Sequence, residues 1–379
     1  MSTFRNWLVA GAATALAAAG ATTAHAQQPL PAAVTYKPDC ATPSGVCPTP
    51  PIYQFNPLNP NVPNSGVPNV PGVGTPAVGD PTPSFASTLT GAGLGDEASV
   101  GLGGYIDPAA PATMFRMRYD SAYGNNRPDR AEMFYAKCGC FRLAQPPQRD
   151  ARGPGRVETN VDYQELSPYL EVAFAPRFSV FATVPVRFIN PTVNPNASGL
   201  SDISVGFKYA LLYSAERILT AQLQLFTPTG STTEGLGTGT WWLQPGLLFQ
   251  RRMNCRWSVF GEIHDRIPLA PVSDWAGNVL RYGLGTSYIA AQGANWYVAP
   301  VVEAVGWSVL SGKELADGNV VNSRGDTIVN AKFGVRIGFG QPTGGPALTG
   351  SDLYIGYGRA LTGEVWYKNM FRIEYRKFF

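Results

Sequence analysis

The sequence predicts an all-β protein: an antiparallel transmembrane β-barrel of about twelve strands, preceded by a disordered Pro-rich segment. Three observations carry this prediction. From Thr113 onward, apolar and polar residues alternate with a period of two, as in a strand with two different faces. The connections between these segments are alternately short and long. Charged residues make up only 15% of the chain while Gly and Pro number 42 and 33, which favours many short strands over helices.

Residues 1–26 are predicted to be a secretory signal peptide. Arg5 precedes an apolar stretch rich in Ala and Gly, and small residues at Ala24 and Ala26 suit cleavage before Gln27. The alternative is an uncleaved anchor helix, although the stretch is only weakly hydrophobic. Export would place the remaining chain in an oxidising compartment.

Export also bears on the five cysteines. Cys40 with Cys47, and Cys138 with Cys140, are each close enough in sequence to close a small loop, which leaves Cys255 over. Two cysteines that are one residue apart form at best a strained ring. We therefore expect either a labile local disulfide between Cys138 and Cys140 or pairing elsewhere.

Residues 27–112 are predicted to be a Pro/Gly-rich periplasmic linker. The stretch 27–83 holds nearly half of the prolines, and such a composition buries too little apolar surface to offset the entropy of ordering. Residues 84–112 are Gly-rich but less polar. They either pack as a short plug or lid at a mouth of the barrel or continue the linker.

Residues 113–379 are predicted to form the barrel. At its start Phe115 and Met117 share one face of a strand, while Arg116 and Arg118 share the other. The same alternation recurs in segments that are each near the length of a tilted membrane strand. The predicted strands are 114–120, 169–174, 178–188, 202–211, 218–226, 242–250, 257–265, 279–288, 296–304, 329–340, 352–358 and 371–379.

The predicted strands are joined by links of two kinds. Short links include 175–177, 214–217 and 291–295. Longer links alternate with them: 121–156, 190–198, 227–239, 268–278 and 311–326. Short turns on one rim and long loops on the other are typical of outer-membrane barrels. The link 341–351 departs from this scheme, because it is long although it falls on the short-turn rim.

Alternation alone does not say which face meets lipid, since a soluble sandwich alternates too. Two further features favour the membrane. Glycines fall on the polar face, where they clear space on the concave side of a closed sheet: Gly206, Gly246, Gly283, Gly285, Gly334, Gly338, Gly356 and Gly358. Aromatic residues at strand ends suit two interfacial girdles: Tyr119, Phe188, Tyr209, Trp241, Trp257, Tyr288, Trp296 and Tyr375.

The last strand, FRIEYRKFF, carries a third feature. It resembles the C-terminal signature of bacterial outer-membrane barrels, with Phe371, Ile373 and Tyr375 on one face and Phe379 at the end. Lys377 departs from that signature, at a position that is usually hydrophobic. The resemblance implies recognition by the barrel-assembly machinery. We expect this strand to pair with the first one and so remove both edges of the sheet.

A second resemblance begins near residue 163. SPYLEVAFAPRFSVFATVPVRFINP followed by GLSDISVGFKYALL resembles the outer-membrane family associated with the meta-pathway of phenol degradation, which is often described as transporter-like. Gly199, Asp202, Gly206, Lys208 and Tyr209 carry the match. The stretch NRPDRAEMFYAKCGC is not part of that pattern. The resemblance implies small hydrophobic or aromatic solutes.

The polar face supplies the candidate functional residues. Basic and acidic side chains are mixed on it, with basic ones in excess. They either line a water-filled passage or pair across the barrel and plug it. The lumen-lining candidates are Arg116, Arg118, Glu171, Arg187, Lys208, Gln222, Gln224, Glu262, His264, Arg281, Glu303, Lys332, Arg336, Arg372 and Glu374, with Arg376 beside them.

These residues predict an outer-membrane channel for the passive passage of small solutes. One alternative is a structural or adhesive barrel with a plugged lumen. A barrel hydrolase is a second alternative, but His264 is the only histidine after residue 26 and no His-x-Ser pairing is present. We expect no enzyme activity, cofactor or metal. A formal net charge of +3 gives no reason to expect nucleic-acid binding, so the expected partners are lipid, the assembly machinery and a solute.

Overall fold

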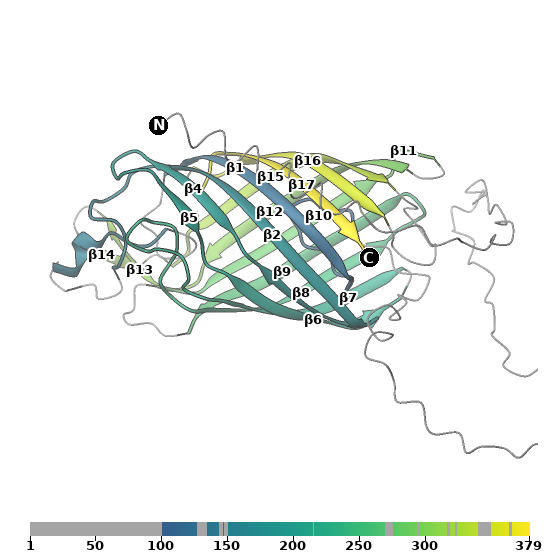
Figure 1. Cartoon of the computed structure of the whole chain (residues 1–379), viewed down its shortest axis with the longest axis horizontal. Helices are drawn as coiled ribbons and strands as arrows, with labels where there is room; N and C mark the ends of the chain where they lie inside the picture. Colours follow the sequence, from purple (N-terminus) through teal and green to yellow (C-terminus); the bar gives the residue numbers. More distant parts are fainter. Residues whose placement is uncertain are drawn as a thin grey trace, which may run out of the picture. The chain divides into compact units, whose positions relative to one another are not determined.

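The computed structural model describes residues 101–126, 135–143, 147, 151–214, 216–269, 276–293, 296–316, 319–322, 324–339, 350–363 and 366–379. The predicted signal peptide, the linker up to residue 100, Cys40 and Cys47 lie outside these residues. Figure 1 shows the described strands as one closed antiparallel barrel. Among the described residues, no helix is long and apolar enough to cross a membrane.

The barrel has twelve strand positions, as predicted. Two positions are each built from two short strands in line. The strands are β1 (Met114–Asn125), β2 (Val161–Ala175), β3 (Phe178–Thr183) with β4 (Val186–Pro191), β5 (Ala197–Leu200) with β6 (Ser204–Tyr213), β7 (Arg217–Phe226), β8 (Trp242–Arg252), β9 (Trp257–Pro268), β10 (Val279–Tyr288), β12 (Trp296–Val309), β15 (Thr327–Phe339), β16 (Ser351–Ala360) and β17 (Asn369–Phe378). Shorter strands outside the barrel positions are β11 (Ala291–Gln292), β13 (Lys313–Ala316) and β14 (Asn319–Asn322).

The first and last strands close the sheet. β1 pairs with β2 on one side and with β17 on the other, in a register that joins Met114 to Phe378 and Tyr123 to Asn369. Closure leaves neither of these strands as an open edge, so their backbone N–H and C=O groups are satisfied without water.

Each in-line pair of strands is interrupted, and the two interruptions lie side by side in the barrel wall. β3 ends at Thr183 and β4 begins at Val186, with Pro185 between them, and proline has no N–H to donate to a ladder. Backbone bonds bridge the break: Val184 N donates to Pro168 O at 3.0 Å and Ser201 N donates to Pro185 O at 2.9 Å. The wall therefore stays continuous there.

The two ends of the barrel differ. We call the end with the connections 176–177, 214–216 and 253–256 the short-turn rim, and the end with the loops 126–160, 227–241 and 310–326 the long-loop rim. Figure 1 shows the C-terminus at the short-turn rim and the β13–β14 hairpin at the long-loop rim. The exceptional link after β15 lies at the short-turn rim, and most of it falls outside the described residues.

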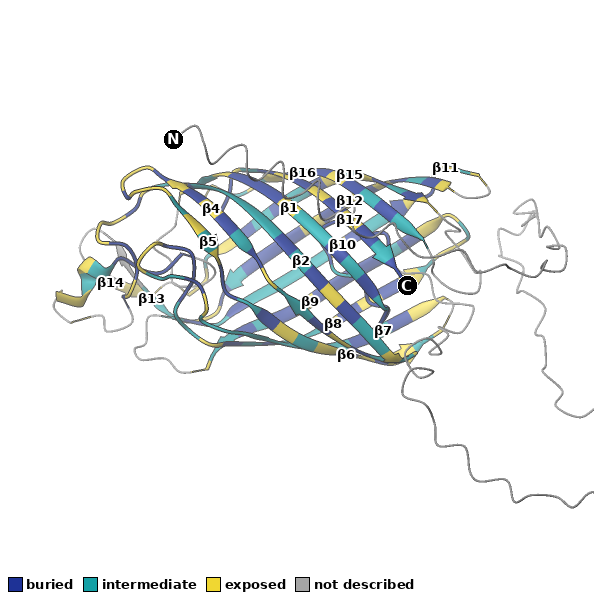
Figure 2. Cartoon of the chain, in the orientation of Figure 1, coloured by how far each residue is buried: buried dark blue, intermediate teal, exposed yellow. Residues whose placement is uncertain are grey.

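The outer face of the barrel is apolar. Leu170, Leu284, Phe333 and Ile355 each have about half of their surface exposed, and the residues beside them in each strand are buried or half-buried. Figure 2 shows this alternation along the strands. An apolar band around a closed sheet that satisfies its own backbone is a lipid-facing surface. The protein is thus an outer-membrane barrel.

Aromatic side chains border this band. Trp257, Tyr288 and Trp296 are exposed near the short-turn rim, and Trp241 is exposed at the long-loop rim. Amphipathic rings at these depths suit the two membrane interfaces.

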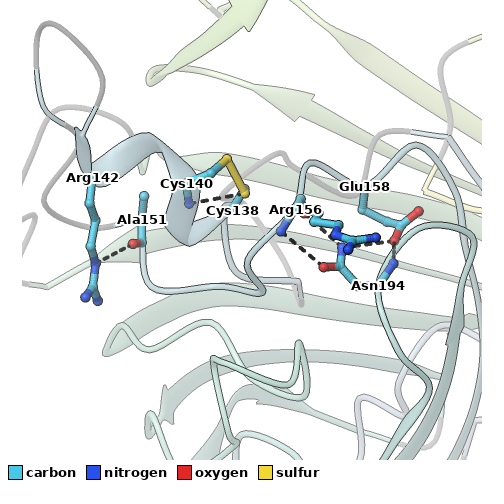
Figure 3. The surroundings of a disulfide bond; sticks show 7 residues. All are labelled: Cys138, Cys140, Arg142, Ala151, Arg156, Glu158 and Asn194. Atoms are coloured by element: carbon cyan, nitrogen blue, oxygen red, sulfur yellow. Dashed lines mark hydrogen bonds between the residues drawn. A yellow bond between two sulfur atoms is a disulfide. The ribbon is translucent and has the colours of Figure 1, made fainter.

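The first long loop carries the 3₁₀ helix η1 (Gly139–Leu143) and a disulfide between Cys138 and Cys140. Figure 3 shows the disulfide beside Arg142, whose Nε donates to Ala151 O at 2.7 Å. Cys255, at the opposite rim, is itself disulfide-bonded, so the expectation that it is left over is wrong. The expectation rested on sequence spacing, which does not restrict pairing to neighbours.

Glu158 fastens the end of this loop to the turn between β4 and β5. Its carboxylate accepts hydrogen bonds from the backbone N–H groups of Val193 at 3.0 Å and Asn194 at 2.9 Å. Figure 3 shows Glu158 with Asn194. Burial acts to raise the pKa of this carboxyl, but the N–H donors of Asn194 and Val193 outweigh it and hold the pKa below its ordinary value.

Candidate functional site

Residues 101–112, with the sequence GLGGYIDPAAPA, lie inside the barrel. We call them the inserted segment. Leu102, Tyr105, Ile106 and Ala112 are buried, although the segment belongs to no strand. Its first residue contacts Arg376 and its last contacts Glu171, both toward the short-turn rim, while its middle reaches Glu303 halfway along β12. The segment therefore occupies the short-turn half of the lumen.

One carboxylate holds the backbone N–H groups at the middle of the segment. Glu303 Oε1 accepts hydrogen bonds from the N–H groups of Gly104, Tyr105 and Ile106 at 3.1, 3.1 and 3.0 Å. Consecutive N–H groups that converge on one anion form a charge-assisted cluster, which is stronger than the same number of neutral bonds. Glu303 is the anchor of the segment.

The carbonyl groups of the segment are held by side chains of the wall, most of them cationic. Arg336 donates to Leu102 O at 3.2 Å and also to Gly103 O. The remaining contacts join Gly101 O to Arg376 (2.9 Å), Gly104 O to Arg372 (3.0 Å), Tyr105 O to Arg281 (3.1 Å), Pro108 O to Lys208 (3.2 Å) and Ala109 O to Thr220 (2.6 Å). The basic excess of the inner face therefore has acceptors within the chain.

The inner face also carries bulky apolar residues beside its charges and glycines. Leu248 packs with Ala109 and Ala110, and Phe260 packs with Ile106. These side chains face inward because they cover the apolar parts of the inserted segment, so burial there removes them from water rather than exposing them to a channel.

Tyr354 illustrates why glycine is needed on the inner wall. A Cβ at Gly334 or Gly356 would lie 2.2 or 2.4 Å from the Tyr354 hydroxyl oxygen, and one at Gly104 would lie 2.0 Å from its ring. The three glycines let one buried ring lie between the wall and the inserted segment.

Buried ion pairs connect neighbouring strands beside the segment. Arg372 of β17 binds Asp120 of β1 through two hydrogen bonds of 2.6 Å, across the seam that closes the barrel. Other pairs join Arg336 and Arg376 to Asp352, Arg118 and Arg336 to Glu374, Lys208 to Glu171, Arg187 to Glu165 and Arg281 to Glu262.

Replacing Arg372 with Met is expected to destabilise the barrel by about 3–5 kcal/mol, because Asp120 would remain buried without its counter-charge. The measurement is the free energy of unfolding in detergent, followed by the heat-modifiable gel shift. Arg359→Met is the matched control, since Arg359 is exposed on the neighbouring strand. Equal stability of the two variants would contradict the role of the pair.

Above the segment, toward the long-loop rim, the lumen holds a cavity of about 280 Å³. Tyr105 and Asp107 of the segment form part of its lining, and Tyr163, Gln244 and Trp307 belong to its wall near the long-loop ends of their strands. The cations that touch it are Arg116, Arg118, Arg187, Arg266, Arg281, Lys332 and Arg372. The carboxylates that touch it are Asp107, Asp120, Glu165 and Asp202.

Lys332 lies in a cage of aromatic rings beside this cavity. Its Nζ is 3.7 Å from the centre of the Tyr105 ring, 4.8 Å from that of Tyr367 and 5.8 Å from that of Trp307, and it donates to the Tyr367 hydroxyl. Ring faces attract a cation through their quadrupole. The cage therefore holds the ammonium group in place without a carboxylate.

The structure places the predicted lumen residues on the inner face and divides them between two environments. Arg187, Gln224 and Lys332 line the cavity, as do Arg116, Arg118, Arg281 and Arg372. The others lie away from it, among the contacts of the inserted segment or behind them: Glu171, Lys208, Gln222, Glu262, His264, Glu303, Arg336 and Glu374.

His264 has no arrangement typical of a hydrolase. Its Nε2 lies 3.5 Å from a Glu262 oxygen, and within the described part of the chain its Nδ1 has no hydrogen-bond partner. The ring lies over Gly246, where a Cβ would come within 2.0 Å of Nδ1. The predicted assembly residues Phe371, Ile373, Tyr375 and Phe379 are exposed on the outer face.

Sequence reasoning did not select several residues of the site. Tyr105, Trp307 and Tyr367 were omitted because they lie outside the strands that the alternation predicted. Asp107 lies before the first strand and has no periodic pattern. One signal was available: an excess of inward arginines requires acceptors, and a Gly/Pro-rich segment next to the first strand offers backbone carbonyls.

No group of three or more metal-ligating side chains occurs among the residues that the structure describes. No protein-family model matches the chain. No curated protein matches it either.

Several solved structures are similar to it. An outer-membrane channel from Pseudomonas putida F1 is 16% identical, with a TM-score of 0.45, over 74% of this chain and all of that one. The NanC porin is 12% identical, with a TM-score of 0.39, over 71% of this chain and all of that one. LpxR from Salmonella typhimurium is 11% identical, with a TM-score of 0.35, over 70% of this chain and all of that one.

Proposed function

We propose that this protein is a channel for the passive passage of small solutes across the outer membrane. The observation that carries the proposal is the cavity of about 280 Å³ in the long-loop half of a closed barrel. Polar and aromatic side chains line it together, as in sites that admit small organic molecules. No covalent chemistry and no cofactor is part of the proposal.

In this proposal the inserted segment is the gate. Its backbone contacts the wall mainly through the side chains of Glu303 and several cations. Oxygen atoms of water or of a solute are able to replace such contacts one at a time. Removing a strand of the sheet would instead require breaking its whole ladder of backbone hydrogen bonds. Passage then requires that the segment leave the short-turn half of the lumen.

The solute class in the proposal comes from the resemblance to the family associated with phenol degradation: small hydrophobic or aromatic molecules. The aromatic part of the cavity, which includes Tyr163, Trp307 and Trp366, is compatible with it. Outer-membrane lipid and the barrel-assembly machinery complete the proposed partners.

A structural or adhesive barrel is the second candidate. One observation favours it: the inserted segment fills the short-turn half with both hydrogen bonds and apolar contacts. If the segment never leaves the lumen, the cavity is closed on its short-turn side and no solute crosses the membrane.

Conductance in planar bilayers separates the two candidates. We expect discrete steps from the full chain, and more frequent opening of Glu303→Gln, because that change removes the negative charge that holds three N–H groups. Loss of a charge-assisted contact of about 1.5–3 kcal/mol shifts the equilibrium between the closed and the open gate by about tenfold or more.

Glu216→Gln is the matched control, because Glu216 is exposed in a turn at the short-turn rim. It should behave as the unmodified chain does. Silent bilayers for the full chain and for Glu303→Gln alike would exclude the channel and leave the structural barrel.

A further inference from the structure

The cavity contains polar hydrogens that have no acceptor. Arg116 Nε, Arg281 Nε and Trp307 Nε1 are buried, belong to residues that line it, and have no hydrogen-bond partner in the part of the chain that the structure describes. Each of these atoms is a donor only. A buried donor without a partner costs free energy, so these groups favour a ligand that brings acceptor oxygens.

The carboxylates of the cavity are already engaged. Asp107 is bound by Arg116 at 2.7 Å, Asp120 by Arg372 at 2.6 Å and Glu165 by Arg187. Asp202 accepts hydrogen bonds from backbone and side-chain groups of the loop after β7, at Gly230 and Thr238. They are therefore committed to partners in the protein.

Lys332 differs from them. It is 2% exposed and forms no ion pair with a described carboxylate; its one hydrogen bond goes to the Tyr367 hydroxyl. An ammonium group has three protons to donate. A buried cation is costly unless an anion accompanies it, and aromatic rings offset only part of that cost.

A second cation, Arg281, contacts the same residue, Tyr105, and also pairs with Glu262 at 2.7 Å. Arg281 Nη2 donates to the backbone oxygen of Tyr105, and the ring of the same Tyr105 lies 3.7 Å from Lys332 Nζ. The two cations thus converge on one residue at the floor of the cavity. Beside them the rings of Trp307 and Trp366 form an edge contact with their centres 5.5 Å apart.

We propose that the cavity binds a small single-ring aromatic carboxylate. The carboxylate lies at Lys332 and Arg281, and the ring lies against Trp307 and Trp366. A volume of about 280 Å³ is large enough to hold one such ring. The inference deepens the proposed function and rests on it, since the ligand is a solute on its way through the lumen.

Titration calorimetry of the full-length protein in detergent tests this site, with benzoate as the probe and benzamide as its neutral counterpart. We expect benzoate to bind and benzamide to bind at least about tenfold more weakly, because only the anion makes charge-assisted hydrogen bonds. Acetate should also bind more weakly than benzoate, since it lacks the ring.

Lys332→Met should weaken the binding of benzoate about tenfold or more and leave the binding of benzamide unchanged. Lys377→Met is the matched control, because Lys377 lies on the last strand outside the lumen, and it should bind benzoate as the unmodified protein does. The heat-modifiable gel shift verifies that both variants are folded.

Equal affinities for benzoate and benzamide, or benzoate binding that Lys332→Met does not change, would overturn the anion site. Acetate binding as tight as that of benzoate would overturn the aromatic part. Because binding is measured without flux, silent bilayers would remove the proposed channel while a benzoate site sensitive to Lys332 would still stand.

Discussion

Deleting residues 101–110 is expected to turn the barrel into a wide and continuously open pore. These residues fill the short-turn half of the lumen, and the cavity already occupies the other half. Without them the two halves join into one passage through a twelve-strand wall. Single-channel conductance should rise several-fold, and closures should disappear.

The wall is expected to survive this deletion. Arg372 keeps Asp120, Arg336 and Arg376 keep Asp352, and Lys208 keeps Glu171, so the main cations retain carboxylate partners when the backbone carbonyls are gone. Water in the open lumen solvates the remaining polar groups.

The matched control is a deletion of equal length, residues 313–322, which removes the β13–β14 hairpin at the long-loop rim. That variant should conduct as the full chain does, because the hairpin is a separate two-stranded sheet. If removal of 101–110 left the conductance unchanged while the heat-modifiable barrel remained folded, the segment would not be the block.

Replacing Phe379 with Asp is expected to abolish insertion into the outer membrane. Phe379 directly follows β17 and is 68% exposed, and its N–H donates to Thr113 O at 3.1 Å beside the closing seam. Phe371, Ile373 and Tyr375 continue the same outward face. A charge at the interface costs only about 0–1 kcal/mol in lipid, so the large effect must come from failed recognition of the terminal strand.

The readout is the heat-modifiable form of the protein in outer-membrane fractions. Leu361→Asp is the matched control, because Leu361 is 66% exposed at the opposite rim and does not belong to the terminal strand. It should insert normally. Normal amounts of Phe379→Asp in the outer membrane would show that the terminal residue is not part of an assembly signal.

Strand faces were predictable because the pleat has a period of exactly two residues. Arg116 and Arg118 follow the inward face of β1 and Phe115 the outward face, and the same parity places Lys332 and Arg336 inside β15. Closure was predictable as well, since a strand in lipid must pair on both sides. Local sequence order was enough for both, because side chains of neighbouring residues point to opposite faces.

The contents of the lumen were not predictable in this way. The segment 101–112 has no periodic pattern, and its place depends on distant partners: Glu303 is 199 residues from Gly104, and Arg372, which donates to Gly104 O, is 268 residues from it. Cys255 was misjudged for the same reason, since spacing along the chain says little about distant pairing.

The sequence by itself determined that this chain forms a closed barrel, which residues face lipid and which face the lumen, because each of these follows from a short repeating pattern. Only the tertiary structure decided that Lys332 lies in a cage of rings, that Arg336 holds the inserted segment and that a cavity remains above it. All inward-facing side chains follow the same alternation in the sequence, so the sequence does not distinguish their roles. These roles become distinct only when strand register and the inserted segment bring particular partners within contact distance.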